Sequence, residues 1–588
     1  MDARARTGAG ARMGAWVRAW VRADHWRALL VLVAAGYGIA QLVAVGPGMG
    51  LGWDEVVYVS QVDPRVTATE FIAPRARGIT LLVAPIVLVT SSTEALRVCL
   101  SVLSALALYA SFATWLRLRP GAAAPVAALV FASLWLTLFY GGEAMPNLWV
   151  ALGAVAATGH FLRHVRGDGG RGRLAGLALC VAGTALMRPP DSLWLVLPLG
   201  LALAVPGWGS ALRWGPSVRR ARPGRARRGA AVALVAGCAA GWAEWIAEAY
   251  VRFGGLAARW QAAGAANETG LHFSLAEHAR ALNGPLLCRP PAHCGPAVTS
   301  WVLWWSAVPP LVLLGLYAAR RRGRLPEALV PALAGVSAAV PYVFLVGYAA
   351  PRFLLPAYAL LAFPVAHGAL ALLEGARRGP ARRAGACLVA AGFLAHLTLQ
   401  GVTLDKVVSP RLARREADVR AARALQELGV RGPCLVYGQN AVTIAYRMGC
   451  TGHTVLSWRR ENGFPAAVRD AEARGERVAA VARGRAAPFL LAWERRPLEG
   501  VGPGRWYAYL PRPAPPPEPE AHGAGRPLRE EPARALRQGL AQDERAAVAG
   551  EDHPAQAGAP GLSFPHPGGA AVSRSAGGRP APSGAAGR

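Results

Sequence analysis

The sequence predicts a mainly α-helical, polytopic membrane protein, and three observations carry this prediction. Of its 588 residues, 53% are hydrophobic and only 17% are charged, whereas soluble domains have about 25% charged residues. Long uncharged runs follow one another along the chain. The basic residues stand in short clusters between these runs, as in the cytoplasmic loops of membrane proteins. The net charge of +30 therefore does not indicate a nucleic-acid partner.

Apolar runs of sufficient length predict eleven membrane spans. We expect them at residues 28–46, 96–115, 121–140, 147–162, 174–187, 191–207, 230–250, 299–318, 328–349, 353–373 and 385–402. A further run at 79–90 covers only 12 residues and contains Pro85, whereas a full span needs about 20 residues. We expect this run to be re-entrant or interfacial.

The distribution of arginine predicts the orientation in the membrane. If 79–90 does not cross, one side of the membrane holds 27 Arg in segments 1–27, 117–119, 163–173, 213–228, 320–324 and 377–383. Because basic loops stay in the cytoplasm, we expect a cytoplasmic N-terminus and an extracytoplasmic C-terminal domain in a cell membrane. Lys406 is the one lysine beside 68 Gly and 46 Pro, a bias typical of a GC-rich bacterial genome.

The composition changes along the chain predict four parts. These are a basic cytoplasmic N-terminus (1–27), a multi-span domain (28–402), a small extracytoplasmic α/β domain (403–510) and a disordered tail rich in Pro, Gly and Ala (511–588). In the third part, strand-like and helical stretches alternate, which favours an α/β arrangement. They are expected at 433–438, 441–448, 454–458, 477–482 and 506–510. The tail has too few aromatic residues to bury a core.

The cysteines agree with the predicted orientation. Four of the eight lie in apolar runs, and the other four, Cys288, Cys294, Cys434 and Cys450, lie on the predicted outer side. An even number in an oxidising compartment favours two disulfides, most simply 288–294 and 434–450. Four free thiols are the alternative.

Adjacent carboxylates follow the first predicted span. A glycine-rich segment from Gly46 leads into Trp53-Asp54-Glu55-Val-Val-Tyr58. Neighbouring side chains on a helix do not face each other, so only one carboxylate can point into a cavity. It could serve as a general base towards a hydroxyl or amine, hold a divalent cation, or simply cap the helix.

This motif resembles the signature of GT-C-fold glycosyltransferases. Protein O-mannosyltransferases and lipid A aminoarabinose transferases carry a similar Asp-Glu-x-x-Tyr after the first transmembrane helix. The resemblance implies an enzyme that moves a sugar from a polyprenyl-phosphate carrier to an extracytoplasmic acceptor, with Asp54 as catalytic base beside Glu55 and with Tyr58 near the substrate. It covers about 28–402.

Later motifs fit the same resemblance. Arg75 and Arg77 lead into the short run at 79–90, where the family places a basic residue near the lipid phosphate. Glu143 and Asn147 lie where the family has a second acidic site, although the family often has Asp near Asn147. Gly347–Pro356, with Arg352, resembles an Arg-Tyr-Leu-Leu-Pro pattern, with Phe353 in place of Tyr.

Physical arguments add to these candidates. Arg binds phosphate oxygens through a planar fork. Arginines at predicted outer helix ends therefore suit a phosphate, and these are Arg75, Arg77, Arg188 and Arg352. The alternative is that their side chains snorkel to the membrane surface. Glu244 and Glu248 lie four residues apart, hence on one helix face. Glu248 could line the cavity or pair with Arg252. His272 and His278 are expected to be exposed loop residues.

The sequence therefore predicts an inverting membrane glycosyltransferase. Its expected partners are a polyprenyl-phosphate-linked sugar donor, the lipid bilayer and an unidentified glycan, lipid or protein acceptor. The sequence does not call for a cofactor, and it leaves open whether the enzyme uses a divalent metal ion. The alternatives are a transporter or flippase, and a non-catalytic assembly protein whose outer domain binds a partner.

Overall fold

The computed structural model describes residues 24–119, 121–167, 170–204, 223–290, 294–375, 380–455, 464–484, 486–502 and 504–512. The predicted N-terminal segment 1–27 lies outside the described residues except for 24–27. The predicted tail 511–588 lies outside them except for 511 and 512.

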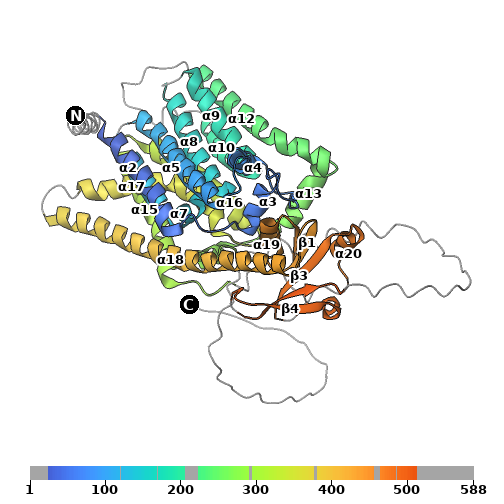
Figure 1. Ribbon diagram of the computed structural model, residues 1–588. Helices are drawn as coiled ribbons and strands as arrows, with labels where there is room; N and C mark the ends of the chain where they lie inside the picture. The colour runs from blue at the N-terminus through green and yellow to red at the C-terminus, as the bar shows by residue number, and fades with distance from the viewer. Residues whose placement is uncertain are drawn as a thin grey trace, which may run out of the picture. The chain divides into compact units, whose positions relative to one another are not determined.

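Helices make up most of the described chain, and at least one lies in each of the eleven ranges predicted to span (Figure 1). They are α2 (His25–Ala40), α3 (Trp53–Val59), α4 (Gly78–Val87), α5 (Thr93–Leu118), α6 (Ala123–Ala132), α7 (Trp135–Gly141), α8 (Pro146–Val165), α9 (Arg171–Met187), α10 (Pro189–Ala204), α12 (Pro223–Arg252), α13 (Leu256–Ala266), α14 (Leu275–Ala281), α15 (Thr299–Arg321), α16 (Leu325–Phe344), α17 (Leu355–Gly375), α18 (Pro380–Glu427), α19 (Ala441–Met448) and α20 (Ala466–Ala473). The π-helix η1 (Gln41–Val45) extends α2. The 3-10 helices η3 (Pro351–Leu354) and η5 (Pro488–Ala492) precede α17 and the strand β4 (Glu494–Leu498).

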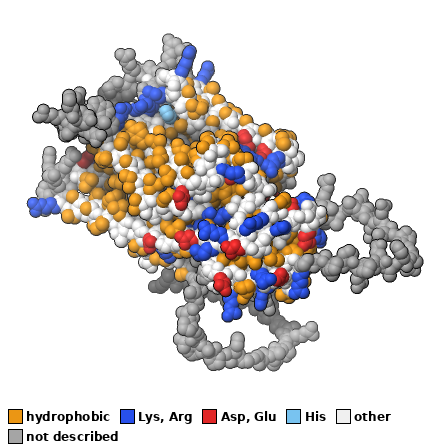
Figure 2. Space-filling view, viewed as in Figure 1, with side chains coloured by type: hydrophobic (Ala, Val, Ile, Leu, Met, Phe, Trp, Pro, Cys, Tyr) orange, Lys and Arg blue, Asp and Glu red, His pale blue; other side chains and the backbone are white. Residues whose placement is uncertain are grey.

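The prediction of a polytopic helical protein is confirmed, with fewer full spans than eleven by length and composition. Among the described residues, seven helices are long and apolar enough to cross a membrane, or eight if a bent pair counts as one span. Figure 2 shows apolar side chains covering the face formed by α2 and the first half of α18. Leu32, Val43, Leu388 and Leu394 are exposed there, as expected for a surface that contacts lipid.

Two segments depart from straight spans. Helix α4 has 10 residues, which at 1.5 Å per residue gives about 15 Å against a bilayer core of about 30 Å; it is too short to cross, as predicted. The run predicted as one span at 121–140 is divided into α6 and α7, bent by 75°. The side-chain oxygen of Gln400 accepts a hydrogen bond from the backbone N–H of Trp135 at 2.9 Å, which satisfies a free amide at the start of α7.

The C-terminal part forms a five-stranded sheet in the order β2-β1-β3-β5-β4 within the described residues. Strands β1 (Cys434–Gly438), β2 (Thr451–Thr454) and β3 (Arg477–Arg483) are parallel, while β5 (Trp506–Leu510) runs antiparallel to β3 and to β4 (Glu494–Leu498). Strand β2 begins three residues before the predicted 454–458, and the sequence analysis does not predict β4 or α20. The small α/β unit itself is confirmed.

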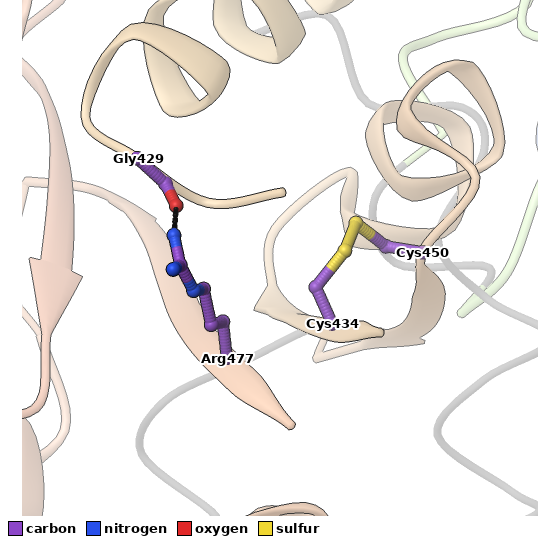
Figure 3. Close-up of a disulfide and its surroundings, with 4 residues drawn as sticks. All are labelled: Gly429, Cys434, Cys450 and Arg477. Atoms are coloured by element: carbon purple, nitrogen blue, oxygen red, sulfur yellow. Dashed lines mark hydrogen bonds between the residues drawn. A yellow bond between two sulfur atoms is a disulfide. The ribbon is translucent and has the colours of Figure 1, made fainter. Parts of the chain in front are cut away.

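Both favoured cysteine pairs are joined in the structure, Cys288 to Cys294 and Cys434 to Cys450. The second pair ties the start of β1 to the residue before β2, and beside it the Arg477 guanidinium donates to the carbonyl of Gly429 (Figure 3). Cys434 and Cys450 are both buried.

Helix α18 connects the bundle with the sheet. It runs without interruption through residue 402, where the sequence analysis places a domain boundary. The hydroxyl of Tyr446 in α19 donates to Asp63 at 2.8 Å, and Arg65 pairs with the same carboxylate at 2.7 Å. Burial raises the pKa of Asp63, but the hydrogen bonds from Arg65 and Tyr446 outweigh this and leave it below its ordinary value. These contacts fasten the sheet unit to the segment before α4.

Candidate active site

Asp54 lies between two arginines that come from distant parts of the chain. It stands in the first turn of α3, where the sequence packs Val56 and Val57 inward and leaves Asp54 partly open, with 15% of its side chain exposed. The guanidinium of Arg75 donates to one carboxylate oxygen, and Nη2 of Arg352 lies 3.2 Å from the other. Two positive groups thus meet one carboxylate at a solvent-accessible point.

Glu55 is placed differently from its neighbour. Its two oxygens accept from Arg97 at 2.6 and 2.7 Å, and also from the backbone amides of Ala144 and Gly52, each at 2.8 Å. Only 2% of its side chain is exposed. As the helical spacing predicts, one of the adjacent carboxylates points to the open site while the other is enclosed. Arg97 also donates to the carbonyls of Met49 and Gly50, so this pair fixes the glycine-rich loop.

Arg75 is enclosed by aromatic rings. Its guanidinium lies 5.1 Å from the ring centre of Trp53 and 4.9 Å from that of Tyr58, and 7% of its side chain is exposed. Contacts of this kind attract a cation to a ring face. Tyr58 is buried and therefore shapes the wall around Arg75, with Trp53 on the same helix.

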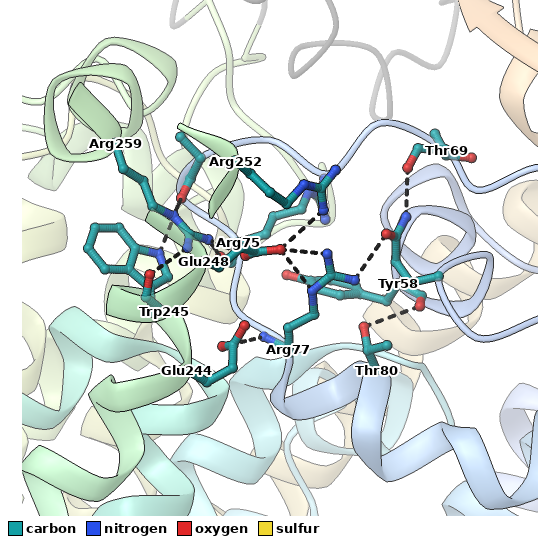
Figure 4. A network of polar contacts seen from close by, with 12 residues as sticks. Tyr58, Thr69, Arg75, Arg77, Thr80, Glu244, Trp245, Glu248, Arg252 and Arg259 are labelled. Atoms are coloured by element: carbon teal, nitrogen blue, oxygen red, sulfur yellow. Dashed lines mark hydrogen bonds and ion pairs between the residues drawn. The ribbon is translucent and has the colours of Figure 1, made fainter. Parts of the chain in front are cut away.

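Arg77 and Glu248 belong to a network that supports the Arg75 loop (Figure 4). Glu248 pairs with Arg77 at 2.6 Å, with Arg252 at 3.1 Å and with Arg259 at 2.8 Å. Glu244 accepts from the backbone amide of Arg77 at 3.4 Å. The face shared by Glu244 and Glu248, predicted from their spacing, therefore meets the loop that precedes α4.

Arg259 is the buried centre of this network, and the sequence analysis misses it. Its side chain is fully buried. It donates to the carbonyls of Ala73 at 3.1 Å, Arg75 at 2.9 Å and Trp245 at 2.6 Å. It thus holds the backbone on both sides of Pro74 and sets the position of Arg75. Its position on the short helix α13 carries no sequence signal beyond the charge itself.

Arg352 is carried by η3 and is held from a second side. Its Nη1 donates to the carbonyl of Leu286 at 3.3 Å, two residues before Cys288 of the Cys288–Cys294 disulfide. Arg188, a weaker sequence candidate, lies 5.0 Å from the ring centre of Phe353, and Arg352 lies 5.5 Å from the same ring. Arg188 therefore lies on the same side of the bundle as the Asp54 site.

Glu143 is close to the Glu55–Arg97 pair, because the backbone amide of the next residue, Ala144, donates to Glu55 at 2.8 Å. Glu143 is buried in the turn before α8 and lines a cavity of about 10 Å³ with Arg97, Gln41 and Ser101, room for about one water molecule. Asn147 is buried in the first turn of α8.

The two loop histidines differ from each other. His272 is exposed as expected. The expectation for His278 is wrong, because it is buried and its Nε2 lies 3.1 Å from the carbonyl of Tyr342. Burial lowers the pKa of His278 to about 4.

The residues do not fit a metal held by several protein ligands. No group of three or more His, Cys, Asp or Glu side chains with suitable spacing occurs in the described part of the chain. The charge around Asp54 also disfavours a cation, because Arg75 and Arg352 already contact its carboxylate. We therefore derive no step through a metal ion.

Comparison with known proteins identifies the fold. No family model and no curated protein matches the chain. The apo structure of ArnT from Cupriavidus metallidurans is similar with a TM-score of 0.53 and 13% identity, over 82% of this chain and 97% of that one. ArnT bound to undecaprenyl phosphate gives 0.47 at 14% identity, over 82% and 97% of the two chains. The apo Archaeoglobus fulgidus oligosaccharyltransferase gives 0.47 at 13% identity, over 78% and 70%.

At 13% identity the likeness to apo ArnT concerns the arrangement of the helices and extends over nearly all of that chain. It agrees with the order of motifs in the sequence, from Trp53–Tyr58 to Arg352. The chain has the GT-C fold.

Proposed function

We propose that this chain is a membrane glycosyltransferase that moves a sugar from a polyprenyl-phosphate carrier to an acceptor on the extracytoplasmic side. The observation that carries the proposal is the position of Asp54 between Arg75 and Arg352. A general base and a phosphate-binding pair are the two groups that such a transfer needs. The GT-C fold, and an ArnT structure that holds undecaprenyl phosphate, support this choice of donor.

The proposed reaction is a single displacement. An acceptor hydroxyl or amine attacks the anomeric carbon while an oxygen of Asp54 takes its proton. The bond between the anomeric carbon and the phosphate oxygen breaks, and polyprenyl phosphate leaves with the electron pair. Arg75 and Arg352 stabilise the charge on the leaving phosphate. The configuration at the anomeric carbon is inverted.

Donor binding would also prepare the base. Without a ligand, both arginines contact Asp54, and cations at a carboxylate favour its charged form. A phosphate entering between Arg75 and Arg352 would take over these hydrogen bonds and leave the carboxylate to accept a proton. Base and phosphate site would thus work in sequence.

The neighbouring groups receive positioning roles in this proposal. Glu55 and Arg97 hold the loop and the first turn of α3. Arg77, Glu248 and Arg259 hold the loop that presents Arg75. Glu143, which lines a small cavity with Arg97, supports the enclosed side of Glu55, and Asn147 is assigned to the wall at the start of α8. Tyr58 and Trp53 shape the wall around Arg75.

The orientation belongs to the proposal too. The arginine-rich segments would face the cytoplasm, which places Asp54, both disulfides and the sheet unit outside. The disulfides support this side, because such bonds persist in oxidising compartments.

The test uses the full chain, purified and placed in lipid nanodiscs, with a panel of undecaprenyl-phosphate-linked hexoses and pentoses and an extract of envelope acceptors. Release of undecaprenyl phosphate is measured. Asp54→Asn should lower the rate by about 10²–10⁴-fold, the usual contribution of a general base. Asp405→Asn, an exposed carboxylate on α18, is the matched control and should leave the rate unchanged.

Two results would count against the proposal. Full transfer activity in the Asp54→Asn variant would refute the assignment of Asp54 as the general base. Movement of a labelled donor across proteoliposomes without any transfer would instead identify a transporter.

A further inference from the structure

Two arginines of the outer part lie against the glycine-rich loop that leads to Asp54. A Cβ placed on Gly50 would lie 2.1 Å from Nη2 of Arg447 in α19 and 3.3 Å from Cβ of Arg415 in α18. The guanidinium of Arg447 therefore lies directly over the backbone of Gly50, and glycine is the residue that leaves room for it there. Figure 2 shows many basic side chains, with acidic ones among them, over the second half of α18 and the sheet.

The positive charge at this place is only partly balanced within the described residues, because the charge of Asp418 acts on Arg415 and Arg447 without a direct ion pair. Neither Arg415 nor Arg447 forms an ion pair with a described carboxylate, and Nε of Arg415 is buried without a hydrogen-bond partner among the described residues. Asp418 accepts from Asn440 at 2.9 Å and from Thr443 at 2.8 Å. Each of its two oxygens thus already accepts a hydrogen bond from a neutral donor.

The two arginines also affect each other. Partial burial lowers the pKa of Arg447 below its ordinary value; the charge of Asp418 counteracts this shift, and the charge of Arg415 adds to it. Two like charges held close together repel each other. A bound anion would relieve this repulsion and would give the buried Nε of Arg415 an acceptor.

Arg415 and Arg447 lie close to the loop that precedes Asp54, the proposed base. The carbonyl of Gly50 accepts from Nη2 of Arg97 at 2.8 Å, and the same nitrogen pairs with Glu55 at 2.7 Å. A group bound at Arg415 and Arg447 would therefore lie beside the loop that carries the proposed base. The donor phosphate is assigned elsewhere, to Arg75 and Arg352.

We infer that Arg415 and Arg447 form an anion site that holds a phosphate group of the acceptor substrate. That the bound phosphate belongs to an acceptor rests on the proposed function. The existence of the anion site rests on the geometry of the two arginines alone. Phosphate is the class that fits best, since two guanidinium forks can contact several of its oxygens at once. The acceptor would thus be a phosphate-bearing glycan or lipid.

Inorganic phosphate is the probe that tests the site. The full chain is placed in phosphatidylcholine nanodiscs and saturated with undecaprenyl phosphate, so that the donor arginines are occupied. Phosphate is then titrated by calorimetry at low ionic strength, because salt screens such contacts. We expect Arg415→Gln/Arg447→Gln to raise the Kd for phosphate at least about tenfold, equivalent to about 1.4 kcal/mol.

Matched variants separate the site from general charge. Arg423→Gln/Arg469→Gln removes two exposed arginines from α18 and α20 and should leave the Kd unchanged. Gly50→Ala should weaken binding by displacing the Arg447 guanidinium while leaving every charge in place. If the double variant does not fold, Arg447→Gln alone serves, because Arg447 is exposed on α19.

Several results would overturn the inference. An unchanged Kd in the folded Arg415→Gln/Arg447→Gln variant would refute the anion site. Loss of phosphate binding in phosphatidylglycerol nanodiscs would assign the site to bilayer headgroups and refute the acceptor role. Asp54→Asn should bind phosphate as the unmodified chain does. Failure of the proposed function would therefore appear in the transfer assay, and failure of this inference in the titration.

Discussion

The adjacent carboxylates Asp54 and Glu55 should give opposite results when each is made neutral, and Glu55→Gln is the sharper test. Glu55 and Arg97 are 2% and 3% exposed and are joined by two short contacts. Removing one partner of a buried ion pair costs about 3–5 kcal/mol, because the other charge stays buried and unmatched. Three backbone carbonyls near Arg97 remain as acceptors, so we expect the lower end, about 3 kcal/mol.

The assay is the free energy of unfolding in mixed micelles, followed by the fluorescence of the 19 tryptophans. Asp54→Asn should change the free energy of unfolding much less, because Asp54 and Arg352 keep contact with water. The double variant Glu55→Gln/Arg97→Met should be more stable than the sum of its parts predicts, since the buried charge is gone. A Glu55→Gln protein of unchanged stability that has lost transfer would refute the positioning role.

Three further outcomes are expected. Arg259→Lys keeps a charge but cannot reach four acceptors, so the Arg75 loop should loosen and the affinity for undecaprenyl phosphate should fall about tenfold by calorimetry. Cys434→Ser/Cys450→Ser opens a loop closed over 16 residues and should lower the free energy of unfolding by about 3 kcal/mol; mass spectrometry of unreduced peptides checks the pairing. His278, whose pKa lies at about 4 in the folded chain against an ordinary 6.5, is protonated more readily when unfolded. Stability should therefore fall as the pH drops from 6.5 towards 4, by up to about 3 kcal/mol. His278→Gln should show a smaller pH dependence than the unmodified chain in unfolding measured across that range, because it lacks the contribution of His278.

The positions of most helices could be predicted because apolar runs of the right length leave few alternatives. The shortness of α4 was visible in the same way. The break between α6 and α7 was not, since 121–140 carries no charged residue and Gln400, which satisfies Trp135, lies 265 residues further on. Strand β4 contains Arg495, Arg496 and Pro497 and lacks the apolar pattern that marks a strand.

The site was predictable as a set of candidates but not as an arrangement. Asp54, Arg75 and Arg352 stood out by residue type and by their place near helix ends. Their mutual contacts, and the separation of Asp54 from Glu55, depend on how α3 is rotated in the fold. Arg97 was missed although the sequence holds a signal for it. An arginine inside a predicted span is costly and needs a partner.

The sequence by itself determined the class of this protein. Hydrophobic runs and the distribution of arginine act locally: each helix satisfies its own backbone hydrogen bonds, and each apolar run favours the membrane independently of the rest. Only the tertiary structure decided which charges meet. A buried charge requires a partner, but the packing of the helices determines which partner it meets. Here the packing brings together Asp54 and Arg352, which are 298 positions apart in the chain. The chemistry proposed for this chain depends on that long-range contact.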